Sequence, residues 1–159
     1  MNQKKPNRLE IFIDGAARGN PGPAGIGVVV TDGSGLVKEV AKYIGEATNN
    51  VAEYTALIFG MEEVRNLGAK ELVINTDSEL LAKQLGGEYK VKSQTLKGLY
   101  AKVTKMLDSF NEIRVNHINR EENKGADRLA NKAIDNAGKK RVGKSFILKH
   151  KNSVPDSLF

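Results

Sequence analysis

Four acidic residues stand where a folded chain could bring their carboxylates together. Asp14 follows a segment of alternating apolar residues, and Asp77 comes soon after the apolar run at 71–75. Glu53 and Asp127 each fall in the first turn of an expected helix, where the helix dipole alone already favours an acid. If the four meet, their repulsion requires cations, and oxygen ligands in a chain without cysteine select Mg²⁺ or Mn²⁺ over Zn²⁺. Such an arrangement would be a phosphoryl-transfer site.

For any one of these acids a purely structural role is the simpler interpretation. A carboxylate where a strand meets a helix or a loop commonly caps the helix or closes a turn. Asp14 and Asp77, however, both follow the carboxyl ends of expected strands, and open α/β sheets place their ligands at that edge. The spacing alone leaves open whether the four acids meet.

The first part of the chain predicts an antiparallel meander. Residues 9–13 alternate between apolar and other residues, which is typical of a strand. A loop rich in glycine and proline at 15–25 precedes a β-branched second strand at 26–31. The sequence D-G-S-G at 32–35 indicates a hairpin turn, after which residues 36–44 form a third strand.

The rest of the chain alternates between helices and strands. Asn49 and Asn50 are candidate caps of the first helix, and Gly138 is expected to end the last one. The expected helices span residues 51–67, 78–85, 96–110 and 126–137, and the expected strands span 71–75 and 112–119. Strands joined through helices pair in parallel by right-handed crossovers, so we expect an α/β fold with a mixed sheet and helices packed on it.

Four short strings of the sequence occur in a distinctive order. They are I-D-G-A-A-R-G-N-P-G-P-A-G at 13–25, T-N-N-V-A-E-Y-T-A-L at 48–57, N-T-D-S at 75–78 and N-x-x-A-D-x-L-A at 123–130. Together they resemble the four blocks of the type 1 ribonuclease H family, and the resemblance extends from about residue 8 to residue 137. It implies the ribonuclease H-like fold, a five-stranded mixed sheet of order 3-2-1-4-5 with helices on both faces.

The resemblance implies an endonuclease that hydrolyses the RNA strand of RNA/DNA hybrids and leaves 5′-phosphate and 3′-hydroxyl ends. It implies two Mg²⁺ ions, about 4 Å apart, with Mn²⁺ as a substitute. One ion would activate the attacking water and the other would stabilise the leaving oxygen. Asp14 would bridge both ions, Glu53 and Asp77 would hold the leaving-group side, and Asp127 would hold the nucleophile side.

Four polar residues match the family's contacts to the hybrid. They are Asn20, Thr48, Asn49 and Asn50. Amides and hydroxyls suit this task because a 2′-hydroxyl both donates and accepts hydrogen bonds and distinguishes RNA from DNA. Helix capping is the alternative role for Asn49 and Asn50, and the two roles can coexist.

Two residues compete for an auxiliary role beside the fourth carboxylate. The resemblance implies a mobile histidine there that assists product release, and ungapped counting back from Asp127 leads to His117. His117 shares strand parity with Val115, so a packed histidine is an equally good interpretation. Arg120 lies in the following loop with a fixed charge that could meet a phosphate. We retain both as catalytic candidates and favour Arg120 slightly.

Positive charge is concentrated at the two ends of the chain. The 159 residues include 25 basic and 19 acidic ones, but residues 9–137 contain 16 basic and 18 acidic residues. Residues 138–151 contain six basic and no acidic residues. Many family members insert a tryptophan-rich basic handle between the helix that follows T-D-S and the next long helix. This chain has only G-G-E-Y-K-V-K-S at that position, residues 86–93, and it contains no tryptophan, so the handle is absent. We expect the tail to take over part of the grip on the hybrid, through Lys139, Lys140, Arg141 and Lys144.

The same tail contains a misleading motif. Residues 138–145 fit the phosphate-loop pattern G-x-x-x-x-G-K-[ST], but that loop requires a strand before it and a long helix after it. Here a helix precedes it and only 14 residues follow. The sequence therefore does not predict ATP binding.

The chain divides into a basic extension at 1–8, a catalytic domain at 9–137 and a basic tail at 138–159. With no cysteine and no apolar run near the roughly 20 residues of a membrane span, we expect a cytoplasmic monomer without membrane contact. Its expected partner is an RNA/DNA hybrid, with double-stranded RNA as a further candidate. The alternatives are a nucleic-acid-binding module that has lost cleavage, which four acids at the ligand positions disfavour, and a related nuclease acting on other duplexes or on recombination junctions.

Overall fold

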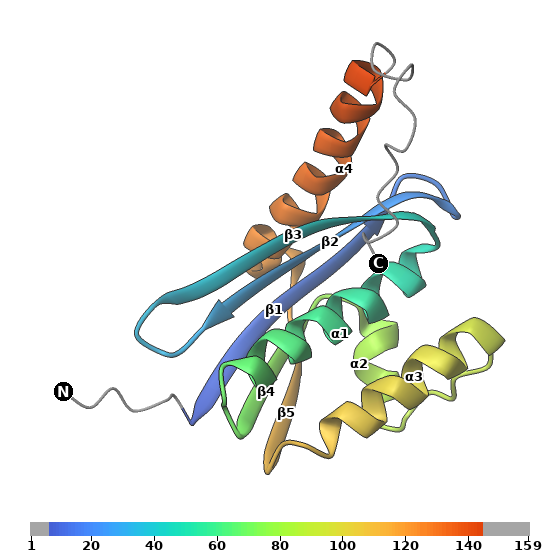
Figure 1. Cartoon of the computed structure of the whole chain (residues 1–159). Helices are drawn as coiled ribbons and strands as arrows, with labels where there is room; N and C mark the ends of the chain where they lie inside the picture. The colour runs from blue at the N-terminus through green and yellow to red at the C-terminus, as the bar shows by residue number, and fades with distance from the viewer. Residues whose placement is uncertain (1–6, 145–159) are drawn as a thin grey trace.

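Five strands form one mixed sheet in the order β3-β2-β1-β4-β5 (Figure 1). The computed structural model describes residues 7–144. The strands are β1 (Arg8–Ala17), β2 (Gly22–Thr31), β3 (Leu36–Ala47), β4 (Glu71–Thr76) and β5 (Glu112–His117). The first three pair antiparallel, whereas β4 runs parallel to β1 and β5 runs parallel to β4. The expected mixed sheet and its strand order are confirmed.

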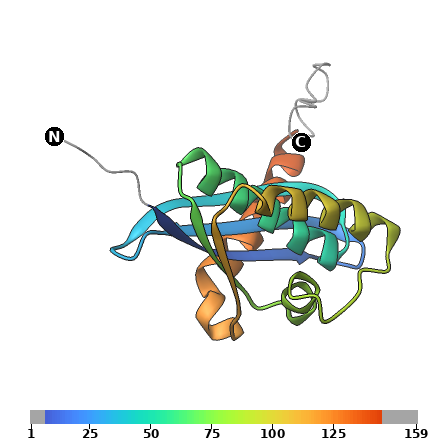
Figure 2. The same cartoon turned by 90° about the horizontal axis from the view of Figure 1, so that it is seen from below.

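The helices cover the sheet from two sides. Within the described residues they are α1 (Asn49–Asn66), α2 (Glu79–Leu85), α3 (Gln94–Leu107), the short 3-10 helix η1 (Arg120–Asn123) and α4 (Lys124–Lys144). Helix α1 packs on β1 and β2 with α3 beside it, and α4 packs against β2, β3 and β1. Figure 2 shows the first turns of α4, in orange, following the end of β5. No helix within residues 7–144 is long and apolar enough to cross a membrane.

The apolar core lies between the sheet and α1. The alternating residues Leu9, Ile11 and Ile13 of β1 are fully buried there, together with Ile74 of β4 and Leu57 of α1. Burying each such side chain contributes about 1.5–3 kcal/mol. This packing fixes β1 and β4 side by side and thereby fixes the polar edge where both strands end.

Two glycines let the helices approach β1 and β2 at close range. A Cβ on Gly15 would collide with the backbone of Ala52 in α1, and one on Gly27 would collide with the carbonyl oxygen of Ala126 in α4. Gly15 follows Asp14 in sequence, and Gly27 lies opposite Asp14 in the β1–β2 pair. Glu53 immediately follows Ala52, and Asp127 immediately follows Ala126. The absence of a side chain at each glycine therefore lets the helix approach closely enough to bring its acid near Asp14.

The start of α1 differs from the expectation. Thr48 is its N-cap, and the Thr48 hydroxyl oxygen accepts a hydrogen bond from the Val51 N–H at 3.2 Å. The Asn49 side chain, expected to cap, instead accepts from the Ala17 N–H at 3.2 Å. The cap is therefore Thr48, while the side chain of Asn49 is bonded to the last residue of β1.

The predicted end of the last helix at Gly138 is wrong. Helix α4 runs through Gly138 to Lys144, and it begins at Lys124, before the expected residue 126. A glycine inside a helix costs only about 1 kcal/mol, and the residues around Gly138 are good helix formers. The part of the expected basic tail at 138–144 is therefore helical, while its remainder and the residues at 1–6 lie outside the described residues.

Candidate active site

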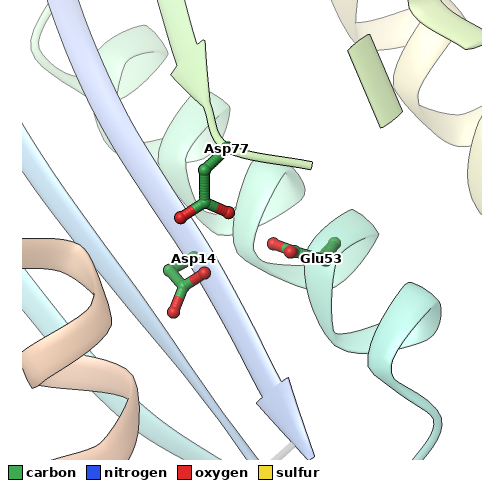
Figure 3. Close-up of side chains that lie close together, drawn as sticks. All are labelled: Asp14, Glu53 and Asp77. Atoms are coloured by element: carbon green, nitrogen blue, oxygen red, sulfur yellow. The ribbon is translucent and has the colours of Figure 1, made fainter. Parts of the chain in front are cut away.

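Three of the four predicted carboxylates gather at one edge of the sheet. Asp14 stands near the end of β1, Asp77 just beyond β4 and Glu53 in α1 (Figure 3). One carboxylate oxygen from each lies within 4.8 Å of the others. We call these three residues the carboxylate cluster.

Strand pairing explains why residues so far apart in sequence meet. In the parallel β1–β4 pair, Ile13 lies opposite Thr76, so Asp14 and Asp77 follow at the same edge. Glu53 is held from the other side, since its Oε1 accepts a hydrogen bond from the Gly15 N–H at 2.8 Å. The cluster is therefore set by the fold rather than by local sequence.

Asn123 anchors the third carboxylate. Its Nδ2 donates to the carbonyl oxygen of Ile13 at 2.9 Å and to Oδ2 of Asp77 at 3.2 Å. The residue is 1% exposed, and its Oδ1 has no hydrogen-bond partner within the described part of the chain. Sequence reasoning included Asn123 in a motif but gave it no role, because a neutral amide carries no periodic or charge signal.

Burial and neighbouring negative charge disfavour ionisation of two residues of the cluster, Asp14 and Glu53. Asp14 is 6% exposed, and desolvation, then the negative charges of Asp77 and Asp127, raise its pKa to about 8. Glu53 is 5% exposed, and desolvation followed by the charge of Asp14 raises its pKa well above the usual range. The positive charge of Arg120 opposes both shifts. Without a cation, Asp14 and Glu53 hold protons that an exposed carboxylate would release.

Asp127 stands beside the cluster at the start of α4. The negative charge of its side chain helps to raise the pKa of Asp14, so the fourth predicted acid lies close to the site. Unlike the cluster it is exposed, and its Oδ1 accepts from Nδ2 of Asn131 at 3.2 Å. The structure thus brings all four predicted acids into one neighbourhood with different burial.

The two auxiliary candidates lie at the same edge. Arg120 is exposed in η1, and its charge acts on both Asp14 and Glu53. His117 ends β5 opposite Thr76 and is exposed, so the packed interpretation of this histidine is wrong. Because Arg120 and His117 are both exposed, both side chains are accessible to a substrate.

The four predicted polar residues line one pocket next to the cluster. The pocket measures about 540 Å³, and we call it the polar pocket. Asn20, Thr48, Asn49 and Asn50 line it together with Ser93, Thr95 and Leu96 at the start of α3, among other residues. Ser93 and Thr95 were not predicted as site residues, and Ser93 is also the N-cap of α3.

The predicted basic contacts lie away from this edge, toward the far end of α4. Lys139 is exposed and lines a different pocket, of about 630 Å³, with Arg18 and Tyr43. The side chains of Lys140, Arg141 and Lys144 lie outside the part of the chain whose side chains the structure describes.

A single mixed sheet of this order, with carboxylates where β1 and β4 end, defines the ribonuclease H-like class of folds. A family model described as reverse transcriptase-like matches residues 12–133. The ribonuclease HI of Halobacterium salinarum is 40% identical over 131 residues, which are 82% of this chain and 66% of that protein. The chain belongs to the type 1 ribonuclease H family.

Two further relatives define the extent of the similarity. The bifunctional protein Rv2228c of Mycobacterium tuberculosis is 44% identical over 132 residues, which are 82% of this chain but 36% of that protein. The chain thus spans about a third of this relative. The crystal structure of LC11-RNase H1 in complex with an RNA/DNA hybrid matches with a TM-score of 0.78 and 47% sequence identity, covering 81% of this chain and 98% of that one.

The cluster fits a divalent cation of the Mg²⁺ type. Its donors are carboxylate oxygens without sulfur or imidazole, which are the ligands that hard cations prefer. Desolvation, followed by the negative charges of Asp77 and Asp127, raises the pKa of Asp14, so its ionised form needs a compensating positive charge. A bound cation would supply that compensation.

Proposed function

We propose that the protein is an endonuclease that hydrolyses the RNA strand of RNA/DNA hybrids with divalent cations. The observation that carries the proposal is the carboxylate cluster, with ligand oxygens within 4.8 Å, beside a pocket lined by Asn20, Thr48, Asn49 and Asn50. Membership of the family and the likeness to a structure solved with a hybrid support it. Products with 5′-phosphate and 3′-hydroxyl ends are part of the proposal.

Asp14, Glu53, Asp77 and Asp127 would hold two Mg²⁺ ions. When bound, such ions polarise the phosphate and lower the pKa of a coordinated water. The protein's own part is to hold the acids in register: the Gly15 N–H fixes Glu53, and Asn123 fixes Asp77. Arg120 would place a fixed positive charge near the scissile phosphate, and His117 would assist product release from the end of β5.

The hydrogen bonds of the polar pocket orient its amides for substrate. Asn49 Oδ1 accepts from the Ala17 N–H, and Asn20 Oδ1 accepts from the Asn49 N–H at 3.1 Å. Because both oxygens face backbone donors, the Nδ2 group of each residue is left to donate outward. A ribose 2′-hydroxyl can accept such a bond and deoxyribose cannot, which would favour RNA in this groove.

The remaining features of the proposal concern the whole chain. The catalytic unit would be residues 9–137, with residues 1–8 and 138–159 adding positive charge that attracts the hybrid. We propose that the protein acts as a cytoplasmic monomer. Double-stranded RNA is a second substrate to be tested.

The proposal is tested by cleavage of end-labelled RNA/DNA, RNA/RNA and DNA/DNA duplexes with Mg²⁺. We expect the wild type to cut only the RNA of the hybrid and Asp14→Asn to be inactive. Phosphatase and kinase treatment of the products would identify their ends. Equal activity in the variant would refute the assignment of the metal ligands, and inactive wild type with tight hybrid binding would favour the silent binding module.

A further inference from the structure

Asp127 is tied to the β1–β2 turn by a chain of side-chain hydrogen bonds. Nδ2 of Asn131 donates to the Asp127 carbonyl oxygen at 3.0 Å and to Asp127 Oδ1 at 3.2 Å. Arg18 donates through Nη2 to Asn131 Oδ1 at 3.2 Å and to the Asn131 carbonyl oxygen at 3.4 Å. Nη1 of Arg18 also forms an ion pair with Oδ1 of Asp135 at 2.7 Å. We call Arg18, Asn131 and Asp127 the α4 hydrogen-bond chain.

Donor and acceptor chemistry fixes the direction of this chain. Both Asp127 atoms that contact Asn131 are acceptors, so the NH₂ end of the amide must face them. The amide oxygen then faces Arg18, which can only donate. Reversing the Asn131 amide would place acceptors against acceptors and donors against donors, so Arg18 sets which group Asn131 presents to Asp127.

The turn that carries Arg18 is held on its other side by the polar pocket. Ala17 donates its N–H to Asn49 Oδ1, and Asn20 accepts from the Asn49 N–H. The turn of four residues between β1 and β2, at 18–21, therefore contacts both the N-terminus of α1 and the side of α4 that carries Asn131 and Asp135. The proposed RNA-contacting residues and the fourth carboxylate share this support.

We propose that Asn131 is a positioning residue for Asp127, with Arg18 holding the Asn131 amide in the orientation this requires. The inference rests on the proposed function, since it assigns Asp127 to the metal site. Asp127 needs such support because it is exposed, whereas burial restrains the other acids Asp14 and Glu53. Partners that orient a metal ligand in this way commonly affect activity or metal affinity by about 10–100-fold.

A merely stabilising role is the alternative. Arg18 and Asp135 form an ion pair whose side chains are 46% and 54% exposed, and pairs this exposed contribute little to stability. The pair can be removed without touching Asn131. Asp135→Asn is therefore the matched control for Arg18→Ala, and Lys132→Ala is the control for a change on the exposed face of α4.

The kinetic test uses the full chain with an RNA/DNA hybrid and Mg²⁺. We expect Asn131→Ala to lower kcat about ten-fold with KM within about two-fold, and Arg18→Lys, which keeps the charge but loses the fork, to lower it less. Asp135→Asn and Lys132→Ala should keep wild-type kcat. In an Asp127→Ala background, Asn131→Ala should cause no further loss, because the two residues act as one unit.

A second measurement follows Asp127 in the metal-free protein without substrate. The side-chain carboxyl carbon of Asp127 and the side-chain amide of Asn131 have separate NMR signals. Arg18→Ala should shift both, although it does not contact Asp127, while Asp135→Asn should leave both near their wild-type positions. Thermal melting would show that each variant remains folded.

The outcomes are distinguishable. An unchanged kcat in Asn131→Ala, or an equal loss in Asp135→Asn, would overturn the inference even with active wild type. If the wild type cuts no hybrid, the proposed function fails, and the NMR comparison still decides whether Arg18 sets the Asp127 carboxylate. Unshifted signals in Arg18→Ala would then refute the positioning chain itself.

Discussion

The carboxylate cluster and the polar pocket lie side by side but differ in how far their polar groups are satisfied. In the cluster, Asp14 and Glu53 are buried, and each pKa is raised by desolvation first and by neighbouring negative charge second. In the pocket, Asn20 and Asn49 are exposed, and each amide oxygen already accepts a backbone hydrogen bond. The cluster requires a partner of opposite charge, whereas the pocket is organised before any partner arrives.

This difference separates two contributions to function. A cation would stabilise the ionised form of the buried acids in the cluster, so we expect the cluster residues to govern the rate of the chemical step. A pocket with fixed donors loses little freedom on binding, and its residues should govern affinity and choice of strand. Substitutions in the two regions should therefore change kcat and KM separately.

The largest expected effect comes from removing the charge at the centre of the cluster. Asp14→Asn should lower kcat about a thousand-fold or more, because several kcal/mol of charge stabilisation are lost. The same variant should raise the melting temperature of the metal-free protein at alkaline pH, since it removes a repelling buried charge. Single-turnover cleavage and calorimetry measure the two effects, with exposed Asp108→Asn as control. Parallel loss of activity and stability would contradict this account of the cluster.

The next largest effect is expected from a substitution that disturbs the packing of α4 against β2 without changing any polar group. Gly27→Ala places a Cβ against the Ala126 carbonyl oxygen, so α4 must shift away from β2 with Asp127 on it. We expect a loss of about 1–3 kcal/mol in the free energy of unfolding, together with a lower kcat. Gly98→Ala, in a helix position with open space, is the matched control and should not destabilise. Urea denaturation and hybrid cleavage report the outcome, and normal stability in Gly27→Ala would show that the contact is not tight.

The pH dependence of stability should distinguish the cluster from the pocket. The pKa of Asp14 is about 8 in the folded protein, above its unfolded value, so the folded state binds the proton more tightly. The metal-free protein should therefore lose stability as pH rises from about 4 to about 8, and Glu53 acts in the same direction. Mg²⁺ should oppose the loss, increasingly so at higher pH, because it binds the ionised form. Urea titrations at several pH values, with and without Mg²⁺, measure this dependence of stability on pH. An unchanged dependence in Asp14→Asn would show that another group causes it.

A smaller effect is expected in the pocket. Asn49→Ala removes the acceptor of the Ala17 N–H and the outward Nδ2 donor. We expect KM for the hybrid to rise about five- to ten-fold with kcat within about two-fold, because one hydrogen bond of about 1 kcal/mol is lost. Steady-state kinetics on hybrids that carry a single 2′-deoxy substitution would locate the contact. A fall in kcat alone would place Asn49 with the cluster instead.

The smallest effect lies outside both regions. Gly138→Ala should stabilise the protein by about 0.5–1 kcal/mol, because the position is helical and has open space where the Cβ would stand. Activity should not change. Urea denaturation measures the gain, and a loss of stability would show that α4 needs flexibility at this point.

Much of the fold could be predicted from the sequence because its signals are local. The alternation in β1 and the helical spacing after Thr48 identify the elements, and the four strings of the family identify the sheet order. The end of α4 could not be predicted, because Gly138 is a stop signal only when the chain turns there. Thr48, predicted as a substrate contact, is the N-cap of α1 in the structure, whereas the side chain of Asn49 accepts a hydrogen bond from Ala17, a residue distant in sequence.

The sequence singled out the acids that the fold brings together, but it did not indicate the residues that hold them in place. A carboxylate beside apolar residues is conspicuous, so Asp14 and Asp77 could be recognised from sequence. Asn123, Asn131 and Arg18 are ordinary surface residue types, and their roles depend on a tertiary approach between segments 110 or more residues apart. Such supporting residues can be recognised only from the three-dimensional arrangement of the strands and helices that contain them.

The position of Asp127 in the last helix has a consequence for the protein during its synthesis. Asp14 and Glu53 leave the ribosome early, and Asp127 follows only after both parallel crossovers have been made. At about 5–20 residues per second, several seconds separate the first acid from the last. A nascent chain that has folded its first three strands and α1 already holds two of the acids but cannot complete the site. The proposed cleavage would therefore begin only once the last helix has docked on the sheet, so an unfinished chain would not cut the nucleic acids around it.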